Sequence, residues 1–144
     1  MNTFNPPNPA YKEAVRQILS GMPFVQWLGL SFQHIAPGQV DFVMPSRSEI
    51  TFDGKALQAG PIGSLLDFSG GAAAFTLAPA GVMLATIDFS VKLLAPATGT
   101  RFIGRGQVIS AGKSLIVARA DAFAFDEQGE RQIATGLVTM RVLA

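Results

Sequence analysis

Residues 58–71 hold one charged side chain within a run of small and apolar residues: Gln58-Ala59-Gly60-Pro61-Ile62-Gly63-Ser64-Leu65-Leu66-Asp67-Phe68-Ser69-Gly70-Gly71. Pro61 near the start and Pro79-Ala80-Gly81 at the end bound a predicted helix over residues 59–78, about five turns long. Glycine in a helix interior costs about 1 kcal/mol relative to alanine. The glycines of this helix therefore predict that another backbone packs very close to it, as when a sheet wraps around a central helix.

Shorter elements surround this helix on both sides. The spacing of apolar residues predicts a helix that follows Asn8-Pro9 and ends at Gly21, and a second helical piece over residues 23–28. Alternating residues then predict two strands, at residues 30–35 and 39–44. A polar stretch predicts a loop at residues 45–57. Four β-rich segments follow the central helix, at residues 83–94, 101–110, 115–125 and 132–143.

Short links rich in turn residues join the last four strands, so consecutive strands should pair antiparallel. In the segment 115–125, every second residue is small or apolar, as in a sheet with one covered face. This order of elements predicts an α+β fold in which an antiparallel sheet wraps around a long central helix. We expect a single domain over residues 1–144, with residues 1–21 as an N-terminal helical extension.

The composition indicates a protein that buries part of its surface against a second copy. Of its 144 residues, 49% are hydrophobic and only 15% are charged, which is more apolar than an average soluble domain. A monomer of this size buries a modest fraction of its surface. We therefore expect a homodimer or a dimer of dimers.

Several classes of function are disfavoured by charge and residue content. The net charge of +1 recruits neither nucleic acid nor an anionic membrane. The chain has no cysteine, and His34 is its only histidine, so we expect no metal site and no cofactor. No signal-peptide pattern opens the chain, and Asp67 interrupts its most apolar stretch, so we expect a cytoplasmic protein without a membrane span.

The central helix offers two features that can do chemistry. Asp67 lies in apolar surroundings, which raise the pKa of a carboxylate and leave it a usable base or nucleophile. The alternative is a structural aspartate bonded to backbone or to a hydroxyl such as that of Ser64. At the helix start, around Ala59 and Gly60, unpaired backbone N–H groups favour a developing oxyanion, and Gln58 adds a side-chain amide.

The spacing of these features predicts how they cooperate. Gly60 and Asp67 lie nearly on one helix face but about 10 Å apart along its axis. One carbonyl group cannot touch both. Two helices that run antiparallel across a two-fold interface would bring the start of one helix to Asp67 of the other, and so create two equivalent sites.

A second motif lies downstream: Ala85-Thr86-Ile87-Asp88-Phe89-Ser90-Val91-Lys92-Leu93-Leu94-Ala95-Pro96-Ala97. Together with residues 58–71 it resembles the hotdog-fold acyl-CoA thioesterases of the PaaI type. Their helix carries His-Gly-Gly with an Asp nine residues after the His, and their strand reads T-x-D-x-x-x-x-x-L-x-P-A. The order of helices and strands also matches from about residue 20 to residue 143.

The resemblance implies a role for each matching residue. Asp67 takes the place of the catalytic carboxylate, Ala59 and Gly60 that of the glycines whose N–H polarises the carbonyl, and Thr86 that of a hydroxyl that places water. The chain departs from the pattern at Gln58, where the family has His, and at Ala59, where it has Gly. Where the family often has an Asn, this chain has Phe52-Asp53.

Further residues are candidates for contact with substrate. We expect such contacts from Phe52, Ser64, Phe68 and Asp88. Asp88 follows Thr86 by two residues and should share its strand face. For Asp88, a structural bond to a turn is an equal alternative. Apolar residues that could line an acyl or aryl pocket are Met22, Phe24, Trp27, Phe68 and Phe75. Basic residues that could hold CoA phosphates, or simply solvate strand edges, are Lys92, Arg101, Arg105, Lys113 and Arg119.

The expected function is hydrolysis of an acyl- or aryl-CoA thioester to a free acid and CoA, either by water that Asp67 activates or through an anhydride with Asp67. The partners expected are the acyl-CoA and a second copy of the chain. Because of the departures at Gln58, Ala59 and Phe52, a different class stays open: a hotdog protein that binds acyl-CoA or another apolar ligand without turnover.

Overall fold

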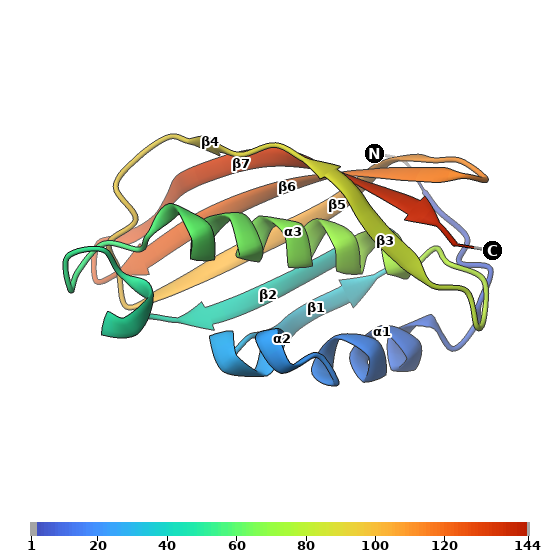
Figure 1. The fold of residues 1–144 in the computed structure, drawn as a ribbon, viewed down its shortest axis with the longest axis horizontal. Helices are drawn as coiled ribbons and strands as arrows, with labels where there is room; N and C mark the ends of the chain where they lie inside the picture. The colour runs from blue at the N-terminus through green and yellow to red at the C-terminus, as the bar shows by residue number, and fades with distance from the viewer. Residues whose placement is uncertain (1–2, 144) are drawn as a thin grey trace.

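A long helix lies in the curve of an antiparallel sheet in the computed structural model, which describes residues 3–143 (Figure 1). Met1, Asn2 and Ala144, at the ends of the expected domain, lie outside the described residues. The helices are α1 (Tyr11–Ser20), α2 (Pro23–Leu28), the short 3-10 helix η1 (Ser48–Ile50) and α3 (Ala59–Phe75). The strands are β1 (Ser31–Ala36), β2 (Gln39–Pro45), β3 (Leu84–Phe89), β4 (Lys92–Leu93), β5 (Arg101–Ala111), β6 (Leu115–Asp126) and β7 (Gly129–Val142).

The sheet has the strand order β1-β2-β5-β6-β7-β3, and β4 also pairs with β7. Every pair of neighbouring strands is antiparallel. One face of the sheet covers α3, while α1 and α2 lie beside β1 at the opposite side of the helix from β3 and β4 (Figure 1). The expected α+β architecture, a hotdog fold, is confirmed.

The backbones of helix and sheet approach each other most closely at a glycine of the sheet rather than at the glycines of the helix. A Cβ atom on Gly106 of β5 would collide with the backbone carbonyl of Ser69, and one on Gly104 with the Ser69 hydroxyl. On β6, four alanines that face the helix are fully buried: Ala118, Ala120, Ala122 and Ala124. Within the helix, a Cβ on Gly70 would collide with the Val138 side chain but would meet no backbone, and one on Gly60 would meet open space. The expected backbone contact exists, but the predicted reason was wrong for the helix glycines.

The central helix ends three residues earlier than predicted. The Thr76 hydroxyl donates to the Ala73 carbonyl at 2.6 Å and accepts from the Gly38 amide at 2.7 Å. Beyond it, the amides of Leu77 and Ala78 bond to carbonyls three residues back, which tightens the chain into a turn. A buried threonine that is anchored to a distant loop therefore stops the helix.

The predicted strand 83–94 is two strands with a bend at residues 90 and 91. At the bend, the Ser90 amide donates to the Leu137 carbonyl at 2.9 Å, and a side chain on Gly136 would collide with the Ser90 carbonyl. The predicted loop 45–57 contains η1 and a bridge between Thr51 and Leu57. In the last hairpin β7 begins at Gly129, three residues before the predicted start.

No helix within residues 3–143 is long and apolar enough to cross a membrane.

Candidate functional site

Asp67 projects from the middle of α3 toward β3. Its Oδ1 atom accepts a hydrogen bond from the Thr86 hydroxyl at 2.9 Å. The sequence left Ser64 as an alternative partner, but the Ser64 hydroxyl donates to the Gly60 carbonyl at 3.0 Å, one helical turn back. The structure therefore joins Asp67 to the threonine of the second motif.

A cavity of about 230 Å³ lies against this pair. Apart from Asp67 and Thr86 its walls are apolar: Leu19, Met22, Phe68, Gly71, Ala72, Phe75, Leu84 and Met140. Three of the predicted pocket residues, Met22, Phe68 and Phe75, thus lie together. The sequence did not indicate Leu19, Leu84 or Met140, which lie on other elements than Asp67.

Burial in this apolar wall raises the pKa of Asp67, and the hydrogen bond from Thr86 partly opposes the rise. The carboxylate is half-buried, so it is desolvated yet still reachable. The Thr86 oxygen also lies 3.1 Å from the Met140 sulfur, so its single proton has two possible acceptors. A carboxylate in such a setting is suited to accept a proton.

The start of α3 presents backbone donors to solvent. The amides of Leu57 and Gln58 are bonded to the carbonyls of Ala97 and Ile50, whereas Pro61 has no N–H. The first amides of a helix lack intrahelical acceptors, and within residues 3–143 no other acceptor contacts those of Ala59 and Gly60. Both residues are exposed, and the Gln58 side chain makes no capping bond. Two free donors thus stand together at the positive end of the helix.

A second cavity, of about 360 Å³, opens beside this helix start. It is lined by Phe52, Gln58 and Ala59 together with Ala56, Leu57, Ile62, Leu93, Ala95, Pro96 and Ala97. Asp53 does not reach into it as a ligand-binding group, because its Oδ1 accepts from the amides of Lys55 and Ala56 at 2.9 and 2.8 Å. These bonds lower the pKa of Asp53 and hold its loop closed.

The predicted site residues therefore fall into two groups. Phe52, Gln58 and Ala59 line one cavity, and Asp67, Phe68 and Thr86 line the other. Asp88 joins neither. A bulge in β3 sets Thr86 opposite Met140 but Asp88 opposite Thr139, so the two residues lie on opposite faces of the sheet. The expectation that they share a face was wrong.

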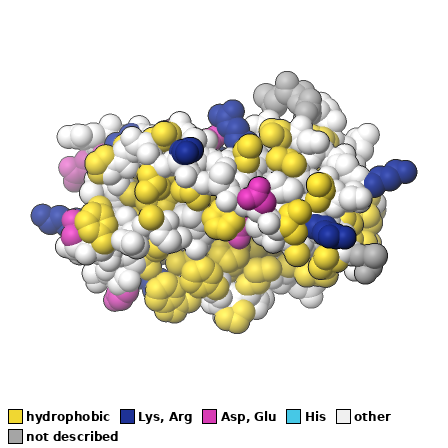
Figure 2. Space-filling model, turned by 45° about the horizontal axis from the view of Figure 1, so that its top comes forward, with side chains coloured by type: hydrophobic (Ala, Val, Ile, Leu, Met, Phe, Trp, Pro, Cys, Tyr) yellow, Lys and Arg dark blue, Asp and Glu magenta, His cyan; other side chains and the backbone are white. Residues whose placement is uncertain are grey.

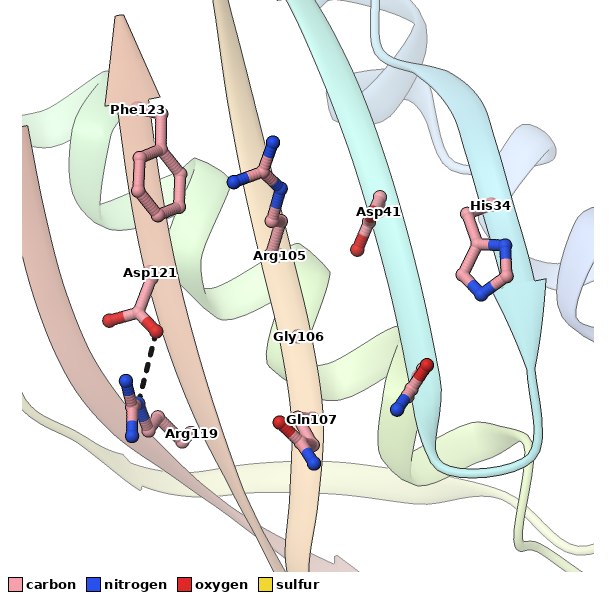
Figure 3. A pocket seen from close by; sticks show the side chains of 9 residues that line it. His34, Asp41, Arg105, Gly106, Gln107, Arg119, Asp121 and Phe123 are labelled. Atoms are coloured by element: carbon pink, nitrogen blue, oxygen red, sulfur yellow. Dashed lines mark hydrogen bonds and ion pairs between the residues drawn. The ribbon is translucent and has the colours of Figure 1, made fainter. Parts of the chain in front are cut away.

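The outer face of the sheet carries a polar cavity of about 250 Å³ (Figure 3). Four of its residues are direct cross-strand neighbours, in the order His34, Asp41, Arg105, Asp121. Arg119 pairs with Asp121 at 3.0 Å, as the dashed line in Figure 3 marks, and Arg105 pairs with Glu130 at 2.6 Å. The charges of these arginines are already matched within the chain.

Arg105 lies between Gly104 and Gly106, which face α3, and Arg119 lies between two buried alanines. Successive residues of a strand point to opposite faces. Both arginines therefore face away from the Asp67 cavity, which removes them from the candidates for CoA phosphate contacts there. Among the described residues no cluster of three or more His, Asp or Glu side chains could hold a metal ion.

Comparisons with known proteins identify the family of this chain. The sequence model of the thioesterase superfamily matches residues 59–130. A thioesterase family protein from Silicibacter pomeroyi has 36% sequence identity over 92% of this chain and 98% of that one, with a TM-score of 0.90. The chain belongs to the thioesterase superfamily. That membership supports thioesterase activity in general terms.

More distant structures share the fold. The PaaI protein from the phenylacetic acid degradation operon of E. coli is 14% identical over 93% of this chain and 94% of that one, with a TM-score of 0.81. A thioesterase from Haemophilus influenzae is 19% identical over 99% and 92%, with a TM-score of 0.78. No curated protein sequence matches the chain.

Proposed function

We propose that this protein hydrolyses an acyl- or aryl-CoA thioester to a free acid and CoA. One observation carries the proposal: a half-buried carboxylate, Asp67, is fixed by the Thr86 hydroxyl in the wall of an otherwise apolar cavity. The cavity suits an acyl or aryl group. The carboxylate suits the activation of water beside it.

The active unit in this proposal is a homodimer. The donors at Ala59 and Gly60 lie about 10 Å along the helix axis from Asp67, so a second chain must supply one of the two. An edge for that chain is available at β3 and β4, where Ile87, Phe89, Leu93 and Leu94 are each roughly half exposed. Figure 2 shows hydrophobic side chains spread over this side of the molecule, with few charged ones among them. An exposed apolar surface of this kind indicates a protein interface.

The chemistry then follows in two steps. Asp67 takes one proton from a water molecule, and the oxygen of this water attacks the thioester carbonyl. The Thr86 hydroxyl donates to Asp67 and accepts a hydrogen bond from the same water. The carbonyl oxygen becomes an oxyanion, and the partner's free helix-start amides donate to it. The carbon–sulfur bond then breaks and CoA leaves as a thiolate. Asp67 transfers its proton to this thiolate, which restores the carboxylate.

An attack by Asp67 itself on the carbonyl would release CoA first and leave an acyl–aspartyl anhydride, which water then cleaves. The same residues serve both routes.

The test is a thiol-release assay over short, medium and aryl acyl-CoA thioesters. We expect turnover by the wild type and a loss of about 10²- to 10⁴-fold in kcat for Asp67→Asn, which keeps the side chain's shape but cannot accept the proton. Asp67→Ala should lose as much. Equal turnover by wild type and both variants would refute the mechanism. Binding of CoA without turnover of any thioester would instead assign the protein to the non-catalytic class.

A further inference from the structure

The chain contains a single tryptophan, Trp27, and it lies on α2 with 52% of its surface exposed. The Cζ atom of Arg47, which follows β2, lies 4.7 Å from the centroid of the Trp27 ring. A guanidinium over an indole face is the strongest common form of cation–π contact. A large aromatic surface and a positive charge are therefore held together at the surface.

The charge of Arg47 is not neutralised within the described part of the chain. The ion pairs found there join carboxylates to Arg105, Arg119 and Arg131 instead. The Nε and Nη2 atoms of Arg47 are buried and have no hydrogen-bond partner. A guanidinium stays charged in such a setting, and its attraction for an anion grows as water is excluded. Arg47 therefore has no anionic partner within the described part of the chain.

An aromatic strip connects this position to the Asp67 cavity; it consists of Trp27, Phe24 and Phe68. The Trp27 and Phe24 rings are 6.2 Å apart and nearly parallel, and the Phe24 and Phe68 rings are 5.9 Å apart. Phe68 lines the Asp67 cavity, whereas Phe24 has 48% of its surface exposed. The strip therefore leads from the carboxylate to the unpaired arginine.

We propose that the aromatic strip and Arg47 bind the nucleotide end of CoA, with the adenine against Trp27 and a phosphate at Arg47. The proposal rests on the proposed function, because it takes the thioester to lie in the Asp67 cavity of the same chain. The pantetheine arm then follows Phe24 from the cavity to the nucleotide.

Charge and shape select this occupant over the alternatives. A nucleotide combines a flat π-face, which stacks on aromatic side chains, with phosphates that pair with arginine. An acyl group would cover the rings but leave Arg47 without an anion. A second copy of the chain would need to place a carboxylate at Arg47 as well as cover both rings.

The first experiment needs no turnover. Adenosine 3′,5′-bisphosphate, which carries the base and phosphates of CoA but no thioester, is titrated into the wild-type protein while the fluorescence of Trp27 is recorded. Because Trp27 is the only tryptophan, the signal reports on this position alone. We expect saturable quenching that weakens with added salt.

A matched pair of variants separates the site from charge in general. Arg47→Ala should weaken the binding of the bisphosphate about tenfold or more, because a desolvated ion pair is lost. Arg101→Ala removes another arginine that stacks on a ring, with its Cζ 4.8 Å from the Phe125 centroid. Arg101 precedes Arg105 by four residues on β5 and so points to the same outer face, away from the Asp67 cavity. The Arg101→Ala variant should therefore leave the titration unchanged. Trp27→Ala, followed by calorimetry, should weaken binding as well.

The kinetic counterpart compares two substrates with the same acyl group. Arg47→Ala and Trp27→Ala should raise KM for the acyl-CoA, with kcat unchanged, but should leave KM unchanged for the acyl-pantetheine thioester, which lacks the nucleotide. A purely structural role would alter both substrates alike.

The failures of the two proposals can be told apart. No saturable quenching by the bisphosphate, or equal weakening by Arg47→Ala and Arg101→Ala, overturns the nucleotide site even where hydrolysis is normal. Quenching by the free acid alone assigns the strip to the acyl group instead. Arg47-dependent quenching without hydrolysis of any thioester upholds the nucleotide site and rejects the proposed function.

Discussion

Two regions of α3 carry groups suited to catalysis, and they differ in burial and in hydrogen bonding. In the middle of the helix, Asp67 is half-buried, bonded to Thr86, and faces an apolar cavity. At its start, Ala59 and Gly60 are exposed, and within residues 3–143 no acceptor bonds to their amides. Desolvation makes a carboxylate more basic, whereas oxyanion donors must be open to the ligand.

Because the two regions lie apart on one helix, a single chain is insufficient for the proposed reaction. The two regions share one rigid helix, so their separation of about 10 Å cannot close by a local rearrangement. In the proposed dimer, each region serves a substrate together with the complementary region of the partner's helix. The predictions below disturb one region at a time.

Apart from the loss of Asp67 itself, the largest effect is expected at the helix start. Gly60→Pro removes one N–H, and proline is tolerated in the first turn of a helix. We expect kcat to fall about 10²- to 10³-fold, the usual loss for one oxyanion donor. Gly60→Ala is the control: it keeps the N–H, and its Cβ meets open space. If both variants lose activity equally, the amide of residue 60 is not the donor.

A smaller effect is expected in the pH profile of kcat/KM. In the proposed mechanism activity needs ionised Asp67, so it should fall as the pH drops below the pKa of that carboxyl. The hydrogen bond from Thr86 lowers this pKa, so Thr86→Val should move the acid limb to higher pH. Met140→Leu removes the competing acceptor of the Thr86 proton and should move the limb slightly lower. A limb that stays in place in Thr86→Val would remove Asp67 as the titrating base.

The smallest effect concerns stability. The pKa of Asp67 is raised in the folded state, so the folded protein holds this proton more tightly than the unfolded chain does. Its contribution to stability is present at low pH and is lost as the pH rises through the raised pKa. Asp67→Asn should therefore have a Tm a few degrees above the wild type near neutral pH. This difference in Tm should disappear in acid, where the wild-type carboxyl is protonated. Calorimetry at both pH values measures it, and an equal difference at both would contradict the prediction.

Much of the fold could be predicted because it depends on local patterns. The alternation along residues 115–125 and the apolar central helix both reflect which face is buried, and the structure confirms both. The bend between β3 and β4 was missed because it depends on Gly136, far along the chain. The early end of α3 likewise depends on a bond between Thr76 and the turn at Gly38.

The candidate site was predictable to a similar degree. Asp67 and Thr86 were predicted as site residues from two separate motifs, and their side chains do meet. Arg47, which we propose as a nucleotide contact, was not predicted, since its signal is a contact with Trp27 and the lack of a partner among residues 3–143, and neither is visible in local sequence. Asp88 was misplaced because a bulge cancels the alternation on which its prediction relied.

The most direct test of the shared site is complementation between two inactive variants. Asp67→Asn and Gly60→Pro chains with different tags are co-expressed, and the mixed dimer is purified through both tags. If each site combines Asp67 of one chain with the helix start of the other, one of the two sites is intact, and the mixed dimer should recover about half of the wild-type kcat per dimer. If each chain builds its own site, every site carries a defect, and a purified mixed dimer as inactive as its parents would contradict the account.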